Sequence, residues 1–143
     1  MSGAIRPIAL GVVRRGREIL VFDAYDSVKG ERFHRPLGGG IEFGERAADA
    51  VVRELREEIG CAIRVERLLG VLENVFTHEG REHHEICFVF ETSVDDAALY
   101  ERDVFEVVEV VDGREVRLPA IWVDPDEVEA PLYPDGLREL MAR

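Results

Sequence analysis

The feature that most constrains this chain is a helical segment that gathers three glutamates on one side. Residues 46–59 repeat apolar side chains at three- and four-residue spacing, which predicts a helix with one face against a core. On that helix Glu54, Glu57 and Glu58 share a face, because positions i, i+3 and i+4 lie together. Gly60 follows at the place where a glycine commonly ends a helix.

Such a carboxylate face has two interpretations. Most acidic helix faces are simply solvated, and repulsion among the like charges then only weakens the helix. The other interpretation is a site for a divalent cation, because Mg²⁺ and Mn²⁺ take oxygen ligands and a phosphate group can complete their shell. The helix pattern by itself leaves both interpretations open.

A glycine-rich passage, residues 35–45, precedes the helix and favours the second interpretation. The passage is predicted to be a loop, and its glycines at 38–40 can bring backbone groups close to a ligand. Arg53 lies about two turns into the helix, where it can pair with Glu45 near the helix start. That pair would hold the passage against the helix.

Together these residues resemble the signature box of the Nudix hydrolases. The matching order is Gly39, five residues, Glu45, seven residues, and then Arg53-Glu-Leu-Arg-Glu-Glu-Ile-Gly60. Seven fixed residues at roughly 7% frequency each would coincide at one start point with a chance of about 10⁻⁸. Cys61 departs from the pattern, since the family usually has an aliphatic residue there. A buried cysteine is small and apolar, so it should disturb the packing little.

The resemblance implies divalent-metal-dependent hydrolysis of a phosphoanhydride bond in a nucleoside diphosphate linked to another group. The metal, Mg²⁺ or Mn²⁺, would be held by four residues carried over by position: Gly38 through its backbone carbonyl, Glu54, Glu57 and Glu58. The resemblance gives Glu45 and Arg53 the role of an ion pair that orients the passage and the helix. It also implies a sandwich in which a mixed sheet lies between helices.

Hydrolysis also requires a group that accepts a proton from a water molecule whose pKa the metal lowers. Within the box the catalytic candidates are Glu54, as the base, and Glu57. In some relatives the base is instead an acidic residue on a later loop. Our choice for such an outer acid is Glu115, with Asp112 and Glu109 as competitors, and each of them could equally be a solvated loop residue.

The residues that would bind the substrate are less constrained. Side chains that could meet phosphates, or simply lie on the surface, are Arg32, His34 and Arg35, while His83 and His84 end a predicted loop at residues 77–84 near the expected cleft. Aromatic residues that could stack on a base, or belong to the core, are Phe22, Tyr25, Phe76 and Phe90. Residues 74–78 hold neither the proline of ADP-ribose hydrolases nor the tyrosine of diadenosine-polyphosphate hydrolases. These two subclasses are therefore neither favoured nor excluded, and nucleoside triphosphates and nucleotide sugars also stay open as substrates.

The chain is predicted to be one α+β domain, residues 1–143, built as an α/β/α sandwich with a mixed sheet. The predicted strands span 5–13, 18–25, 63–76, 85–91, 105–111 and 115–123, and the first two and the last two form hairpins. Residues 26–32 are predicted to be a loop, 125–128 a short helix and 135–143 a terminal helix.

Charge and composition limit the classes of molecule that the protein is expected to bind. A net charge of −12 without a basic patch makes nucleic acid an unfavourable partner, so a small-molecule nucleotide is expected. The apolar runs are too short for a membrane helix, and residues 1–13 lack the pattern of a signal peptide, which favours the cytoplasm. A homodimer is plausible from the family resemblance alone.

Two other functions use the same fold. A non-catalytic Nudix domain could bind a nucleotide as a sensor, but such a domain has no need of three clustered glutamates whose repulsion only a metal offsets. Removal of the 5′ pyrophosphate from RNA would use the same chemistry, but the acidic surface disfavours an RNA substrate.

Overall fold

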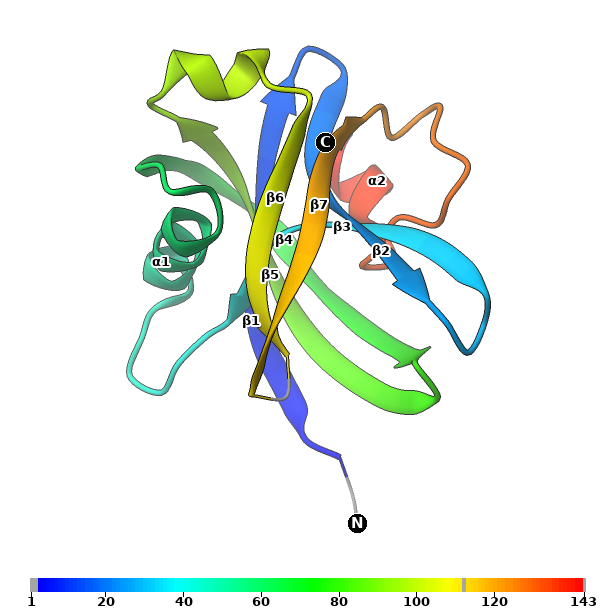
Figure 1. The fold of residues 1–143 in the computed structure, drawn as a ribbon. Coiled ribbons are helices and arrows are strands. Elements are labelled where there is room, and N and C mark those ends of the chain that lie inside the picture. Colours follow the sequence, from blue (N-terminus) through cyan, green and yellow to red (C-terminus); the bar gives the residue numbers. More distant parts are fainter. Residues whose placement is uncertain (1–2, 112, 143) are drawn as a thin grey trace.

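The computed structural model describes residues 3–111 and 113–142, which form a mixed sheet with helices packed against it (Figure 1). Within this part of the chain the strands are β1 (Ile5–Arg15), β2 (Glu18–Asp26), β3 (Glu31–Gly40), β4 (Ile63–His78), β5 (Arg81–Val94), β6 (Val104–Val111) and β7 (Arg114–Val123). The helices are α1 (Ala47–Ile59), a 3₁₀ turn at Ala97–Glu101 and α2 (Leu137–Met141). No helix of the described part is long and apolar enough to cross a membrane.

The sheet has two halves that share β3. Its strand order is β4-β5-β1-β3-β2-β7-β6, and β1 and β5 are its parallel pair. The C-terminal end of β3 pairs with β1, where Gly38 lies opposite Leu10. The N-terminal end of β3 pairs with β2, where Phe33 lies opposite Ala24. Because β3 passes from one half to the other, α1 packs against strands of both halves.

Buried apolar side chains form two clusters that hold the helices to the sheet. In the first, Val51 and Leu55 of α1 are fully buried and pack in one cluster with Trp122 of β7. The second contains Leu137 and Leu140 of α2. The long helix and the short one thus belong to different cores, and the expected α+β class with a mixed sheet and few helices is confirmed.

The helix predicted at residues 46–59 is confirmed as α1, which begins one residue later. Gly60 adopts a left-handed conformation with φ 72°, and its N–H donates to the carbonyl of Arg56. Both predicted hairpins are present, as β1–β2 and β6–β7. The turn residue Asp112 lies outside the described residues.

The loop predicted for the glycine passage is wrong, because residues 38–40 are the end of β3. Their backbones pair with residues 8–10 of β1. Glycine has no side chain, so these residues add nothing to the alternating pattern that marks a strand in a sequence. The predicted loop at residues 26–32 is also too long, since β2 ends at Asp26 and β3 begins at Glu31.

Three other boundaries also differ from the sequence prediction. The predicted loop at residues 77–84 is a two-residue turn, Glu79-Gly80, in which both residues have positive φ. Residues 125–127 form a hydrogen-bonded turn instead of a helix, and the terminal helix is limited to α2. In the first case the pairing of β4 with β5, which extends to His78 and Arg81, leaves only these two residues for the turn.

Gly38 is required by the close approach of β3 to β1. Its φ is +147°, and a Cβ at this position would lie 2.0 Å from the carbonyl oxygen of Ala9. We expect Gly38→Ala to lower the free energy of unfolding by more than about 1 kcal/mol, because backbone atoms cannot move aside as a flexible side chain does. Urea denaturation measures this loss. Gly16→Ala is the matched control, because Gly16 has a positive φ but open space around it, and an equal loss in both variants would contradict the explanation.

Candidate active site

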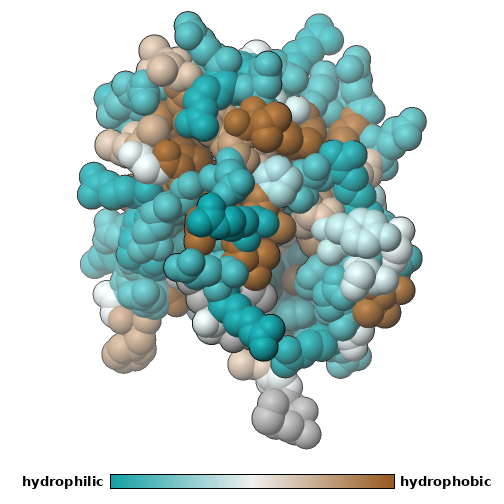
Figure 2. Space-filling view, viewed as in Figure 1, coloured by the Kyte–Doolittle hydropathy of each residue, from teal (hydrophilic) through white to brown (hydrophobic). Residues whose placement is uncertain are grey.

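A cavity of about 790 Å³ lies beside α1 and is lined by strands from both halves of the sheet. Among the described residues that line it, the acidic side chains are Asp26, Glu31, Glu54, Glu57, Glu58, Glu79, Glu85 and Glu109, and the basic ones are Arg6, Lys29 and Arg35. The face of the molecule shown in Figure 2 is also largely hydrophilic, with apolar side chains exposed in separate patches. An anionic ligand could bind in so acidic a cavity only with added cations.

The three glutamates of α1, which we call the box carboxylates, differ in their surroundings. Glu58 is 7% exposed, and neither of its carboxylate oxygens has a hydrogen-bond partner within the described residues. Burial, with a smaller contribution from Glu109, raises the pKa of Glu58 to about 9. Glu54 is half-buried, and its pKa is also raised by burial. The side chain of Glu57 is exposed.

Arg53 connects the helix to the passage before it. Its Nε lies 2.8 Å from Oε2 of Glu45, and its Nη2 donates to the carbonyl oxygen of Gly40 at 3.1 Å. Its Nη1 also donates to Oε1 of Glu54 at 3.0 Å. The guanidinium therefore contacts the passage, the end of β3 and one box carboxylate at once, which fixes their relative positions.

Arg35 of β3 and Glu109 of β6 form an ion pair in the lining of the cavity. Nη2 of Arg35 lies 2.9 Å from Oε1 of Glu109. Burial would lower the pKa of Arg35, but the carboxylates of Glu109, Glu85 and Glu58 together raise it above its usual value. Arg35, a predicted substrate-binding residue, is thus in the cavity. Glu109, which ranked below Glu115 as an outer acid, faces the box carboxylates.

Three predicted site residues lie elsewhere. Glu115 is exposed to solvent. Its neighbour Val116 lines the cavity, and because successive residues of a strand face opposite sides, the side chain of Glu115 is directed away from the cavity. Arg32 is likewise turned away, and its Nη2 lies 2.7 Å from Oδ2 of Asp23. His84 lies 3.3 Å from Glu73, outside the lining of the cavity. Of the candidates named from the sequence, Glu109 and His83 line the cavity, whereas Glu115 and His84 do not.

Aromatic side chains form the end of the cavity away from the box carboxylates. Phe76 of β4 stacks on His83 of β5, with ring centroids 5.0 Å apart and planes 12° apart. Tyr133 stacks on the same phenylalanine, with ring centroids 6.3 Å apart, and Phe33 meets Tyr133 edge-on.

Phe90, another stacking candidate, belongs to the buried core instead. Phe22 and Tyr25 line the cavity, although Phe22 also belongs to the same core and is almost fully buried. His34 of β3 is buried, with Nδ1 3.4 Å from the carbonyl oxygen of Phe22.

Sequence reasoning missed Tyr133. It lies in the irregular segment between β7 and α2, which no periodic pattern marks. A β-bridge between His34 and Leu132 brings this segment to β3, and the N–H of Tyr133 donates to the carbonyl of His34. No signal in the sequence connects residues so far apart.

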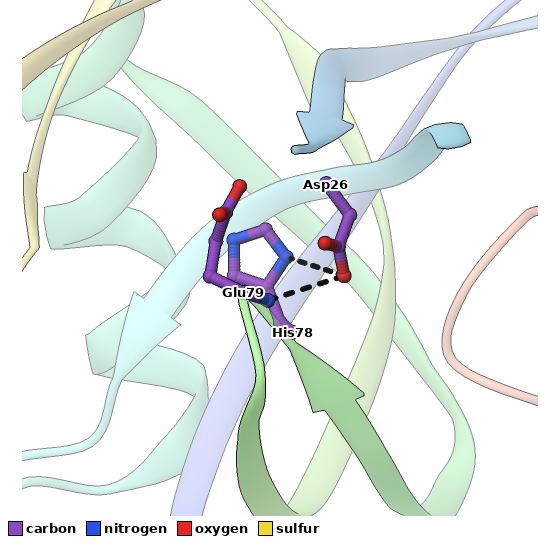
Figure 3. A group of neighbouring side chains, drawn as sticks. All are labelled: Asp26, His78 and Glu79. Atoms are coloured by element: carbon purple, nitrogen blue, oxygen red, sulfur yellow. Dashed lines mark hydrogen bonds and ion pairs between the residues drawn. The ribbon is translucent and has the colours of Figure 1, made fainter. Parts of the chain in front are cut away.

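A second acidic group, Asp26, His78 and Glu79, lies where the turn between β4 and β5 meets the loop between β2 and β3 (Figure 3). Their potential ligand atoms lie within 4.8 Å of one another. The oxygens of Asp26 already accept the N–H groups of Lys29 and Glu79, at 3.0 and 3.1 Å. Burial by itself would raise the pKa of Asp26, but these donors hold it below its usual value. The group thus anchors the two loops to each other.

The box carboxylates fit a divalent cation better than this second group does. Glu58 has two buried oxygens without partners, which is costly unless a cation or a donor arrives. Glu54 and Glu57 supply further ligand oxygens on the same helix face and line the same cavity. The backbone N–H of Gly38 lies near Glu58. An all-oxygen set of this kind suits Mg²⁺ or Mn²⁺.

Comparison with known proteins identifies the family. The NUDIX domain model matches residues 5–143. An ADP-ribose pyrophosphatase from Methanocaldococcus jannaschii is 30% identical over 118 residues, which cover 82% of this chain and 67% of that protein. A MutT NUDIX hydrolase from Burkholderia pseudomallei superposes with a TM-score of 0.58 at 21% identity, over 97% of this chain and 98% of that one. The E. coli ORF135 protein superposes with a TM-score of 0.57 at 20% identity, over 96% and 87% of the two chains.

The Glu45–Arg53 pair makes stability depend on pH. The Arg53 guanidinium and the N–H of Glu42 lower the pKa of Glu45 to about 2, from 4.5. A carboxylate with a lowered folded-state pKa stabilises the fold above its unfolded pKa, and this contribution is lost as the pH falls toward the folded pKa. We therefore expect Glu45→Gln to destabilise the protein at pH 7, and the difference from wild type to shrink steadily below pH 4.5.

Urea denaturation of both proteins between pH 7 and pH 3 measures this difference. Glu129→Gln, at an exposed position, is the control and should show no such trend. A difference between Glu45→Gln and wild type that stays constant down to pH 3 would contradict the role assigned to the pair.

Proposed function

Because this chain belongs to the NUDIX family, we propose that it hydrolyses a phosphoanhydride bond in a nucleoside diphosphate linked to another group, with Mg²⁺ or Mn²⁺ held by the box carboxylates. Membership of the family, together with a relative that is an ADP-ribose pyrophosphatase, makes the chain a pyrophosphohydrolase. Nudix hydrolases need divalent metal ions. The named relative favours a nucleoside diphosphate joined to a sugar as the substrate class.

The observation that supports the proposal most directly is Glu58. A carboxylate with both oxygens buried and no partner is unfavourable in a protein by itself. A divalent cation would compensate that cost and also cancel the repulsion between the acidic cavity and an anionic substrate. The backbone carbonyl of Gly38 would complete the ligand set of Glu54, Glu57 and Glu58.

The remaining catalytic and substrate-binding roles are assigned to individual side chains. When bound, the metal supplies charge neutralisation at the phosphate oxygens and acidifies a water molecule. Glu54, held by Arg53, is the box residue assigned to accept the proton. Glu109 faces the box carboxylates across the cavity and is the second acidic candidate. Arg35, held by Glu109, can donate to a phosphate oxygen.

The first test is metal dependence. We expect wild-type protein to hydrolyse at least one member of a panel of ADP-ribose, UDP-glucose, nucleoside triphosphates, dinucleoside polyphosphates and 5′-triphosphorylated RNA, with Mg²⁺ or Mn²⁺ but not with EDTA. Mn²⁺ should also raise the melting temperature of the protein, because it offsets the repulsion among the box carboxylates. Glu58→Gln should weaken Mn²⁺ binding at least about tenfold and slow hydrolysis.

Asp49→Asn, an exposed position on the same helix, is the matched control and should retain both properties. Nucleotide binding without hydrolysis of any compound would instead favour a sensor, and hydrolysis of the RNA alone would favour the RNA pyrophosphohydrolase. Unchanged Mn²⁺ binding by folded Glu58→Gln would contradict the metal assignment.

The second test compares the two acids on the β6–β7 hairpin. Glu109→Gln should lower kcat by about a hundredfold or more, because it removes a carboxylate that faces the box carboxylates. Glu115→Gln should leave kcat unchanged, since that side chain is turned to solvent. Steady-state kinetics on the best substrate measures both, and the reverse order of effects would restore Glu115 as the outer acid.

A further inference from the structure

Two polar side chains deep in the cavity have no role in the proposed metal site. Asn74 of β4 is 2% exposed, and its Oδ1 has no hydrogen-bond partner among the described residues. Glu85 of β5 is 6% exposed, with Oε2 3.8 Å from Nη1 of Arg6. Asn74 and Glu85 are directly opposite in the β4–β5 ladder, and both line the cavity. A buried acceptor without a donor is unfavourable, so Asn74, with the Glu85 carboxylate opposite it, indicates a ligand that brings hydrogen-bond donors.

The strand register places the pair between the two ends of the cavity. Ile8 of β1 pairs with Gly40 of β3 on one side and with Cys87 of β5 on the other. Gly40 is the last residue of β3, beside the box carboxylates. Counted along β5 from Cys87, Glu85 is two residues away and His83 is four. Each such step of two residues is about 7 Å. The order along the strands is therefore the glycine end of β3, then Glu85, then His83.

The next pair along the same two strands is aromatic. Phe76 lies opposite His83, and their stacked rings form the end of the cavity together with Tyr133. Flat aromatic faces of this kind bind nucleobases by stacking. From one end of the cavity to the other, the lining thus offers a site for phosphates with their metal, then a pair of buried hydrogen-bond acceptors, and then an aromatic surface.

On the basis of the function proposed above, we propose that Asn74 and Glu85 bind the hydroxyl groups of the nucleoside ribose, and that the protein selects ribonucleotide over 2′-deoxyribonucleotide substrates. The parts of a nucleotide follow one another in the same order as these groups. The phosphates would meet the metal ligands, the sugar would meet the acceptors, and the base would meet the aromatic rings. Each ribose hydroxyl donates one hydrogen, and the amide and carboxylate oxygens of the pair accept. A 2′-deoxyribose would leave a buried acceptor unsatisfied, which is the arrangement that discriminates strongly against an analogue lacking a hydroxyl.

The test uses matched ribo and 2′-deoxy pairs of ADP, GDP, CDP and UDP. Calorimetric titration with Mg²⁺ gives the Kd of each, and the base that binds most tightly is taken forward. We expect the ribonucleotide to bind wild-type protein at least about tenfold more tightly than its 2′-deoxy counterpart. Asn74→Ala and the near-isosteric Glu85→Gln should each move this ratio toward one, mainly by weakening the ribonucleotide.

Glu73→Gln is the control, because Glu73 neighbours Asn74 on β4 but lies on its exposed face, and it should preserve the ratio. Melting temperatures identify any variant that is unfolded, and Glu85→Gln keeps the test decisive if Asn74→Ala fails to fold. Equal affinities in wild type, or an unchanged ratio in the folded variants, would overturn the inference. The hydrolysis panel described above separates the two proposals, since activity without ribose selectivity contradicts only this one.

Discussion

The contact between α1 and the glycine end of β3 determines the arrangement of the rest of the molecule. A side chain at Gly39 would displace the Glu54 carboxylate from its place against the strand, because its Cβ would lie 2.5 Å from the carboxyl carbon of Glu54. With hydrogen in that place, the helix lies directly against the strand, and Arg53 bonds to the carbonyl of Gly40. Because β3 belongs to both halves of the sheet, a helix fixed to it packs against both halves and borders the cavity between them.

The same contact determines the electrostatics of the site. α1 brings its carboxylates to the cavity, where burial raises the pKa of Glu58 and Glu54. β3 brings the Arg35 guanidinium to the same cavity, where it interacts with Glu58. Arg53 compensates Glu54 and Glu45 and leaves Glu58 without a partner. The carboxyl oxygens without a partner are thus at one buried position on a rigid element, where burial raises the pKa of the group and a ligand would require little rearrangement of the side chain.

The parts of the structure that follow local periodicity could be predicted from the sequence. The helix, its glycine end and the pairing of Arg53 with Glu45 all depend on spacings of three, four and eight residues, which a helix turns directly into contacts. The far side of the cavity could not be predicted in this way. Whether His83 or His84 faces the cavity depends on strand register, and a shift of one residue exchanges the two faces. Glu109 faces α1 through the β6–β7 pairing, which composition alone does not specify.

The aromatic end of the cavity has a consequence for how the protein matures. Tyr133 is brought to β3 by the segment that follows β7, and it comes after every strand in the chain. During synthesis the sheet and α1 can therefore pair and pack while the cavity still lacks this wall. A nascent chain stopped before this segment would hold its box carboxylates but not its complete cavity, so binding competence would be acquired later than the fold that supports it.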